Sequence, residues 1–105
     1  MYNPFSIADR IILVTGASSG IGRSTAIECS RMGAKLVVTG RNEARLQETL
    51  NALEGEGHLA IVADLTNEEQ MDRLVEQVPA LYGLVNNAGI TEILPTQFIK
   101  RGKLE

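Results

Sequence analysis

A run of apolar residues leads directly into a glycine-rich turn, and this junction limits what the chain can fold into more than any other feature. The run is Ile11–Val14, and the turn that follows reads Thr15-Gly16-Ala17-Ser18-Ser19-Gly20-Ile21-Gly22. An unbroken apolar run of this length suits a strand that is buried on both faces of a parallel sheet. Because helical periodicity begins at the end of the turn, the sequence predicts a buried strand, a tight turn and a helix in succession.

Short apolar runs recur along the chain, with amphipathic stretches between them. Three further runs, at 36–38, 59–62 and 84–85, resemble the first. Helical periodicity separates them at about Gly20–Met32, at about Glu43–Glu54 and around 71–78. The order β-α-β-α-β-α-β is typical of an α/β fold with a parallel sheet and helices on its faces. Right-handed crossovers then predict a three-layer, Rossmann-type doubly wound sheet with strand order 3-2-1-4, truncated after its fourth strand.

Local signals predict how these helices are oriented and where they end. Four side chains at helical spacing are expected to form the inner face of the first helix: Ile21, Thr25, Cys29 and Met32. Gly33 is placed to end that helix in the left-handed conformation. In the third helix, Thr66 and Glu69 fit a capping box, and Pro79 cannot continue the hydrogen-bond ladder.

The glycine turn has the chemistry of a phosphate-binding loop. Glycines let the chain turn tightly and let a pyrophosphate approach the backbone, while the unpaired N–H groups of the helix N-terminus favour anions. Ser18 and Ser19 add hydroxyl donors beside them. A mononucleotide P-loop is excluded, because it needs a Lys and a Ser or Thr after its last glycine, and here Arg23-Ser24 follows at a different spacing. A glycine-rich connection without a ligand is disfavoured by the strand before the turn and the helix after it.

Two further motifs follow later strands. Asn86-Asn87-Ala88-Gly89 comes directly after the fourth run, and Asp64-Leu65 ends the third. Together with Thr15-Gly-x-x-x-Gly-Ile-Gly22, they resemble the classical branch of the short-chain dehydrogenases/reductases, in the style of the 3-oxoacyl-carrier-protein reductases. The resemblance covers nearly the whole chain up to Ile90. It implies an oxidoreductase that transfers hydride between a nicotinamide and a carbonyl/hydroxyl pair.

The turn and the resemblance together predict which residues contact a dinucleotide. The pyrophosphate side is assigned to the turn: Gly16, Ser18, Ser19, Gly20, Ile21 and Gly22. The resemblance places Asp64 and Leu65 beside the adenine, and Asn87, Ala88 and Gly89 against the nicotinamide-side ribose and the pyrophosphate. In the family, Asn86 and Asn87 also tie strands together through side-chain hydrogen bonds, so a structural role for this pair stays open.

The end of the second strand favours NADP(H) over NAD(H). An NAD site generally has an acidic residue there, about 20 residues beyond the glycines, to bind the ribose hydroxyls. Here the strand ends Val38-Thr39-Gly40-Arg41, so glycine stands near the place of the acid and a guanidinium follows. A 2′-phosphate can accept two hydrogen bonds from such a guanidinium. The alternative is that Arg41 is a solvated residue at the start of a helix.

Composition restricts the other function classes. At 105 residues the chain is one domain at most, and its 44% apolar content is ordinary for a globular domain. A net charge of −3 argues against a nucleic-acid surface, and no apolar run approaches the roughly 18 residues of a membrane span. The single Cys29 fits the reducing cytoplasm and, with the single His58, supplies no metal site.

No catalytic residue is assigned. The resemblance implies a catalytic Ser, Tyr and Lys, with the last two in a Tyr-x-x-x-Lys motif. Tyr2 and Tyr82 have Ser6 and Asn86 four residues on, so neither fits. His58 opens a strand far from the glycine turn and is interpreted as structural or solvated.

We therefore expect an NAD(P)-binding half-domain over residues 1–90 and a tail over 91–105 that could be a short helix or a loop. Two functions remain open. One is a short-chain oxidoreductase represented by its cofactor-binding part. The other is a non-catalytic dinucleotide-binding or self-associating module, since an open fourth strand invites a second copy or a complementing chain. An S-adenosylmethionine methyltransferase would need an acid after the second strand and would not explain Asn86–Gly89.

Overall fold

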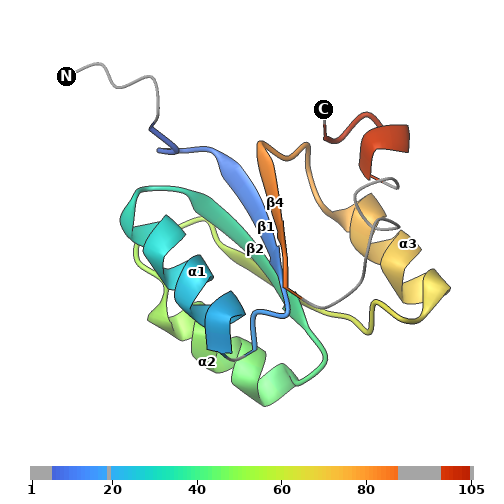
Figure 1. The fold of residues 1–105 in the computed structure, drawn as a ribbon, viewed down its shortest axis with the longest axis horizontal. Coiled ribbons are helices and arrows are strands. Elements are labelled where there is room, and N and C mark those ends of the chain that lie inside the picture. Colours follow the sequence, from blue (N-terminus) through green and yellow to red (C-terminus); the bar gives the residue numbers. More distant parts are fainter. Residues whose placement is uncertain (1–5, 19, 88–97, 105) are drawn as a thin grey trace.

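Strands and helices alternate along the chain, as the apolar periodicity predicts. The computed structural model describes residues 6–18, 20–87 and 98–104 (Figure 1). The elements are β1 Ile11–Thr15, α1 Gly20–Arg31, β2 Lys35–Gly40, α2 Glu43–Ala52, β3 Leu59–Val62, α3 Glu68–Gln77 and β4 Gly83–Asn86.

The four strands form one parallel sheet in the order β3-β2-β1-β4. Helices α1 and α2 lie on one face of this sheet and α3 lies on the other, which gives three layers (Figure 1). The predicted Rossmann-type α/β fold and its 3-2-1-4 strand order are thus confirmed. The chain crosses to the opposite face between β3 and β4, so β1 lies at the switch point, where ligands bind in folds of this kind.

Alternate residues of the buried strands serve two separate cores. Ile12 and Val14 of β1 pack with α1 and α2, whereas Leu13 packs with α3. The core under α3 includes Leu74 and Val75, neither of which is exposed. Because β1 and β2 are buried on both faces, their sequences are continuous apolar runs.

The predicted inner face of α1 is wrong. Ile21 and Met32 are 76% and 59% exposed, and the helix buries a row of small residues: Gly22, Ala26 and Ser30. The reason is steric, because a Cβ on Gly22 would overlap the carbonyl oxygen of Gly16. A helix this close to the chain that leaves β1 can face it only with small side chains. Cys29 is half-buried at the edge of the core. Burial raises the pKa of its thiol, and the Glu28 carboxylate raises it further.

The helix ends follow the predictions in two of three cases. Gly33, two residues after the end of α1, has a φ of 92°, and α3 ends at Gln77, two residues before Pro79. The predicted cap of α3, however, is wrong. Asn67 is the N-cap, its side chain accepting from the Gln70 N–H at 3.1 Å. Thr66 instead donates its hydroxyl to the Asp64 carboxylate, a charged acceptor two residues away.

His58 has the structural role that the sequence suggested. Its Nδ1 accepts a hydrogen bond from the Leu36 N–H at 3.0 Å, and its Nε2 lies 2.7 Å from the Glu54 carbonyl oxygen. Since Nδ1 accepts, Nε2 carries the proton and donates. The ring therefore ties β2 to the loop that follows α2.

Residues 98–104 lie against α3 (Figure 1). Residues 98–100 form a helical turn whose Phe98 is completely buried in the core under α3. Lys103 donates from Nζ to the carbonyl oxygens of Val75 and Glu76, near the end of α3. The short helix considered for the tail is present here as one turn. Among the described residues, no helix is long and apolar enough to cross a membrane.

Candidate functional site

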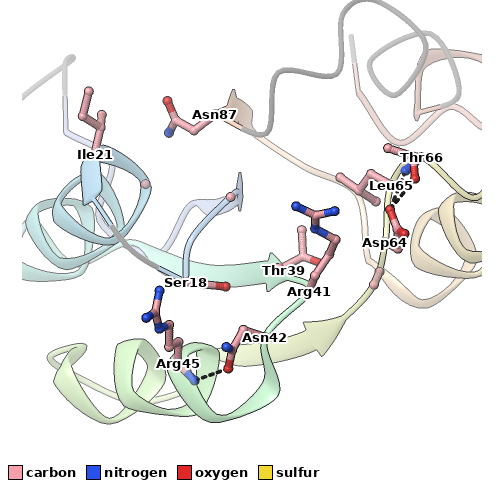
Figure 2. A pocket seen from close by; sticks show the side chains of 14 residues that line it. Ser18, Ile21, Thr39, Arg41, Asn42, Arg45, Asp64, Leu65, Thr66 and Asn87 are labelled. Carbon is pink, nitrogen blue, oxygen red and sulfur yellow. Dashed lines mark hydrogen bonds between the residues drawn. The ribbon is translucent and has the colours of Figure 1, made fainter.

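A cleft of about 570 Å³ lies at the carboxyl end of the sheet. All four strands contribute to it, through Gly16 after β1, Arg41 after β2, Asp64 after β3 and Asn87 after β4. Figure 2 shows these segments surrounding a shared space. Its position at the switch point is the general ligand site of doubly wound sheets.

The cleft gathers most of the residues that the sequence singled out. Eight of them line it: Gly16, Ser18, Ile21, Gly22, Arg41, Asp64, Leu65 and Asn87. Gly20 is described but is not among the lining residues, whereas Ser19, Ala88 and Gly89 lie outside the described residues. Six further residues line the cleft and were not assigned as site residues: Thr39, Gly40, Asn42, Arg45, Ala63 and Thr66. Their strand-end and first-turn positions were the available signal.

The glycine turn brings backbone close to the cleft. Gly16 has a φ of 61°, a conformation that side chains disfavour and that turns the chain sharply after β1. The Ala17 N–H donates to the Thr39 carbonyl oxygen at 3.1 Å, which fixes the turn against β2. The first turn of α1 borders the cleft through Ile21 and Gly22, and the first N–H groups of a helix, which have no partner within the helix, favour an anion.

Two arginines line the cleft from the end of β2 and the start of α2. Arg41 follows β2, and Arg45 lies one helical turn later. Figure 2 shows the Arg41 side chain extending into the space between Ser18 and Asp64. The Asn42 side chain caps α2 by accepting from the Arg45 N–H at 3.0 Å. This wall of the cleft therefore combines two guanidinium groups with a helix N-terminus, all favourable to negative charge.

Gly40 stands where a dinucleotide site of the NAD type would have its acid. A Cβ at this position would overlap the Ser18 hydroxyl oxygen, so the Ser18 side chain takes the space beside β2 that a side chain at residue 40 would need. Ser18 and Gly40 both line the cleft. An acidic side chain at residue 40 would therefore require the Ser18 hydroxyl to move.

Asp64 is held by its neighbour Thr66. The carboxylate Oδ1 accepts from the Thr66 hydroxyl at 2.6 Å and from the Thr66 N–H at 3.0 Å. These hydrogen bonds lower the pKa of the Asp64 carboxyl, and the Arg41 guanidinium lowers it further. Asp64 is therefore an oriented anion at the rim of the cleft.

The two asparagines after β4 have different positions. Asn86 accepts a hydrogen bond through Oδ1 from the Thr15 hydroxyl at 2.9 Å, which ties β4 to the end of β1. Thr15 in turn accepts from the Asn87 N–H at 2.9 Å. The side chain of Asn87 lies at the cleft (Figure 2). The strand-tying role considered for the pair is thus confirmed for Asn86, and Asn87 lines the site.

The family model for short chain dehydrogenases matches residues 10–105. The chain belongs to this family. It is 37% identical over 87 residues to an uncharacterized oxidoreductase of Staphylococcus aureus, covering 79% of this chain and 38% of that one. It is 41% identical over 91 residues to an uncharacterized oxidoreductase of Bacillus subtilis, covering 81% of this chain and 26% of that one. The chain therefore spans about a quarter to two fifths of the length of these relatives.

Solved structures of the family share the fold. A glucose dehydrogenase of Caenorhabditis elegans matches 90% of this chain and 48% of its own, with 31% identity and a TM-score of 0.74. A candidate β-ketoacyl-ACP reductase matches 80% and 35%, with 36% identity and a TM-score of 0.72. A short-chain dehydrogenase/reductase of Burkholderia phymatum, solved in complex with NAD, matches 70% and 27%, with 29% identity and a TM-score of 0.65.

Proposed function

We propose that the cleft binds NADP(H) in preference to NAD(H). The observation that carries this proposal is the wall formed by Arg41 and Arg45, with Gly40 in place of an acid. A 2′-phosphate carries charge that a carboxylate would repel and that guanidinium groups neutralise with paired hydrogen bonds. The same wall offers the ribose hydroxyls of NAD no carboxylate at residue 40.

The remaining residues of the cleft fit the other parts of a dinucleotide. The pyrophosphate would lie over Gly16, Ser18, Ser19 and the Gly20–Gly22 start of α1, where N–H groups are free to donate. Asp64 and Leu65 would contact the adenine. Asn87, with Ala88 and Gly89, would lie toward the nicotinamide. The bound cofactor would supply or accept a hydride, and these residues would orient it.

For the whole protein we propose hydride transfer between this cofactor and a carbonyl/hydroxyl pair, in the cytoplasm. The specific reaction that we propose is reduction of a 3-oxoacyl group on a carrier protein. The sequence motifs resemble those of 3-oxoacyl-carrier-protein reductases, and one similar structure is described as a candidate β-ketoacyl-ACP reductase. The 105 residues contain no Tyr-x-x-x-Lys motif. We therefore expect this chain to bind cofactor without oxidising it when a carbonyl substrate is added.

Titration of the purified chain with NADPH and with NADH tests the proposal. Nicotinamide fluorescence reports binding of either cofactor. We expect NADPH to bind about 10-fold or more tightly than NADH, since hydrogen bonds to a charged group contribute roughly 1.5–3 kcal/mol. Equal or tighter binding of NADH would refute the preference, and binding of neither would refute the dinucleotide site.

A further inference from the structure

The side chain of Arg23 connects two walls of the cleft. One wall is the glycine turn after β1, and the other is the segment of Arg41 and Arg45 at the start of α2. Arg23 Nη2 donates to the Ser18 carbonyl oxygen at 2.6 Å and to the Arg45 carbonyl oxygen at 3.1 Å. Ser18 belongs to the glycine turn and Arg45 to the first turns of α2, and both residues line the cleft. One guanidinium therefore fixes the separation between the two segments, although Arg23 itself is not among the lining residues.

Thr49 completes this connection from within α2. Its hydroxyl donates to the Ala17 carbonyl oxygen at 2.7 Å and accepts from Arg23 Nε at 2.9 Å. Thr49 and Ala17 are both completely buried. Because water does not reach the Ala17 carbonyl oxygen, removing the hydroxyl would leave that oxygen without this partner, which is costlier than losing an exposed hydrogen bond. The partly buried Arg23 Nε–H would lose the same partner.

A second arginine on α1, Arg31, makes an exposed ion pair with a residue just after α2. Arg31 pairs with Glu28 at 2.7 Å and with Glu54, just beyond α2, at 2.7 Å. These side chains are more than half exposed and lie outside the cleft lining. Arg31 thus connects α1 to the loop after α2 without contacting either wall, whereas Arg23 holds the backbone of both walls.

We propose that Arg23 and Thr49 are positioning residues that set the distance between the pyrophosphate-binding turn and the 2′-phosphate-binding wall. This inference rests on the proposed function, because it needs a ligand that spans both segments. When the separation is already fixed, a spanning ligand contacts both walls at once without the entropic cost of ordering them. The affinity of a fragment that contacts only one wall does not depend on this separation, because that wall can move without losing its contacts to the fragment.

The test compares a spanning ligand with a fragment in a Thr49→Val variant. Valine keeps the shape of threonine and removes the hydroxyl. The ligands are NADP+ and adenosine 2′-monophosphate, with dissociation constants measured by NMR titration. We expect the dissociation constant for NADP+ to rise about 10-fold, the effect of one buried hydrogen bond, and that for the fragment to change less than about 2-fold.

Conservative and control variants separate positioning from stability. Thr49→Ser keeps the hydroxyl and is expected to restore most of the NADP+ affinity. Arg31→Met removes the exposed ion pair between α1 and Glu54, just after α2, and should leave both dissociation constants unchanged. Arg23→Met keeps the aliphatic stem, is expected to behave like Thr49→Val, and carries the test should Thr49→Val fail to fold, as judged by circular dichroism.

The outcomes distinguish the two proposals. If the wild-type chain binds neither ligand, the proposed function fails and this inference fails with it. If wild type binds both and Thr49→Val binds NADP+ equally well, the positioning role alone is wrong. Equal weakening of both ligands would also overturn it, because a general loss of structure would affect the fragment as much as the dinucleotide.

Discussion

At Gly22, helix α1 approaches the end of β1 so closely that a side chain would meet backbone. A Cβ there would overlap the carbonyl oxygen of Gly16, which cannot rotate away as a side chain could. We expect Gly22→Ala to lower the free energy of unfolding by about 1–3 kcal/mol, as overpacking does, measured by urea denaturation. Ser24→Ala, on the exposed side of α1, is the control and should stay within about 0.5 kcal/mol of wild type. A Gly22→Ala variant as stable as wild type would show that α1 can move away from β1.

Asp64 makes the stability of the fold depend on pH. The Thr66 hydroxyl and N–H lower the pKa of its carboxyl in the folded chain, relative to about 3.9 in an unfolded one. A lowered pKa means that the carboxylate stabilises the fold above the unfolded value, and that this contribution is lost as pH falls through the folded value. Asp64→Asn should therefore be less stable than wild type at pH 7, and the difference should shrink toward pH 3.

Urea denaturation of both proteins at pH 7, 5 and 3 measures this difference. Thr66→Ala is the matched control, because it removes the donor hydroxyl and keeps the carboxylate. We expect the free energy of unfolding of Thr66→Ala to depend less steeply on pH than that of wild type. A stability difference between wild type and Asp64→Asn that is constant from pH 7 to pH 3 would contradict the account.

Individual site residues were predictable where their role depends on local sequence. Gly16 and Arg41 follow buried strands, and strand ends of a parallel sheet share one edge, so both could be assigned to one cleft. Arg23 and Thr49 could not, because they join segments distant in sequence, through the carbonyl oxygens of Arg45 and Ala17, and neither residue belongs to a motif. Such contacts depend on how two helices pack, and hydrophobic periodicity does not encode that packing.

Among the elements, the turn at residues 98–100 packs into the core under α3 through the side chain of Phe98. Phe98 is completely buried against α3, whereas the adjacent Ile99 is 56% exposed. We expect Phe98→Ala to cost about 3–5 kcal/mol of unfolding free energy in urea denaturation, and Ile99→Ala less than about 0.5 kcal/mol. A small effect of Phe98→Ala would mean that the turn contributes little to the core under α3.

The order of the elements was predictable, and the orientation of one of them was not. Continuous apolar runs identified all four strands. Burial on both faces explains the runs of β1 and β2, whereas the edge strand β3 leaves Leu59 and Val62 exposed. For α1 the same reasoning failed, because it assumes that large apolar residues face the sheet. The close approach at Gly22 reverses this, so small residues are buried and Ile21 is exposed. The cap of α3 was misplaced by one residue because Asp64 engages the hydroxyl of Thr66.

At the scale of the whole molecule, the cleft depends on the topology of the sheet. The crossover from one face to the other between β3 and β4 opens a space beside β1, and all four strand ends reach it. Solved structures of the family share this part of the fold, and one of them was solved with NAD. We propose that the wall at the end of β2, formed by Arg41 and Arg45, sets the preference between NADP(H) and NAD(H).

The cofactor preference of an Arg41→Asp variant tests whether the guanidinium at the end of β2 selects NADP(H). The substitution replaces a group that attracts the 2′-phosphate by one that repels it and can bind ribose hydroxyls instead. Dissociation constants for NADPH and NADH are measured by nicotinamide fluorescence for wild type and variant, with Arg31→Met as the control. We expect the wild-type preference for NADPH to fall at least 10-fold or to reverse in Arg41→Asp and to be unchanged in Arg31→Met. An Arg41→Asp variant that keeps the wild-type ratio of the two constants would contradict this expectation.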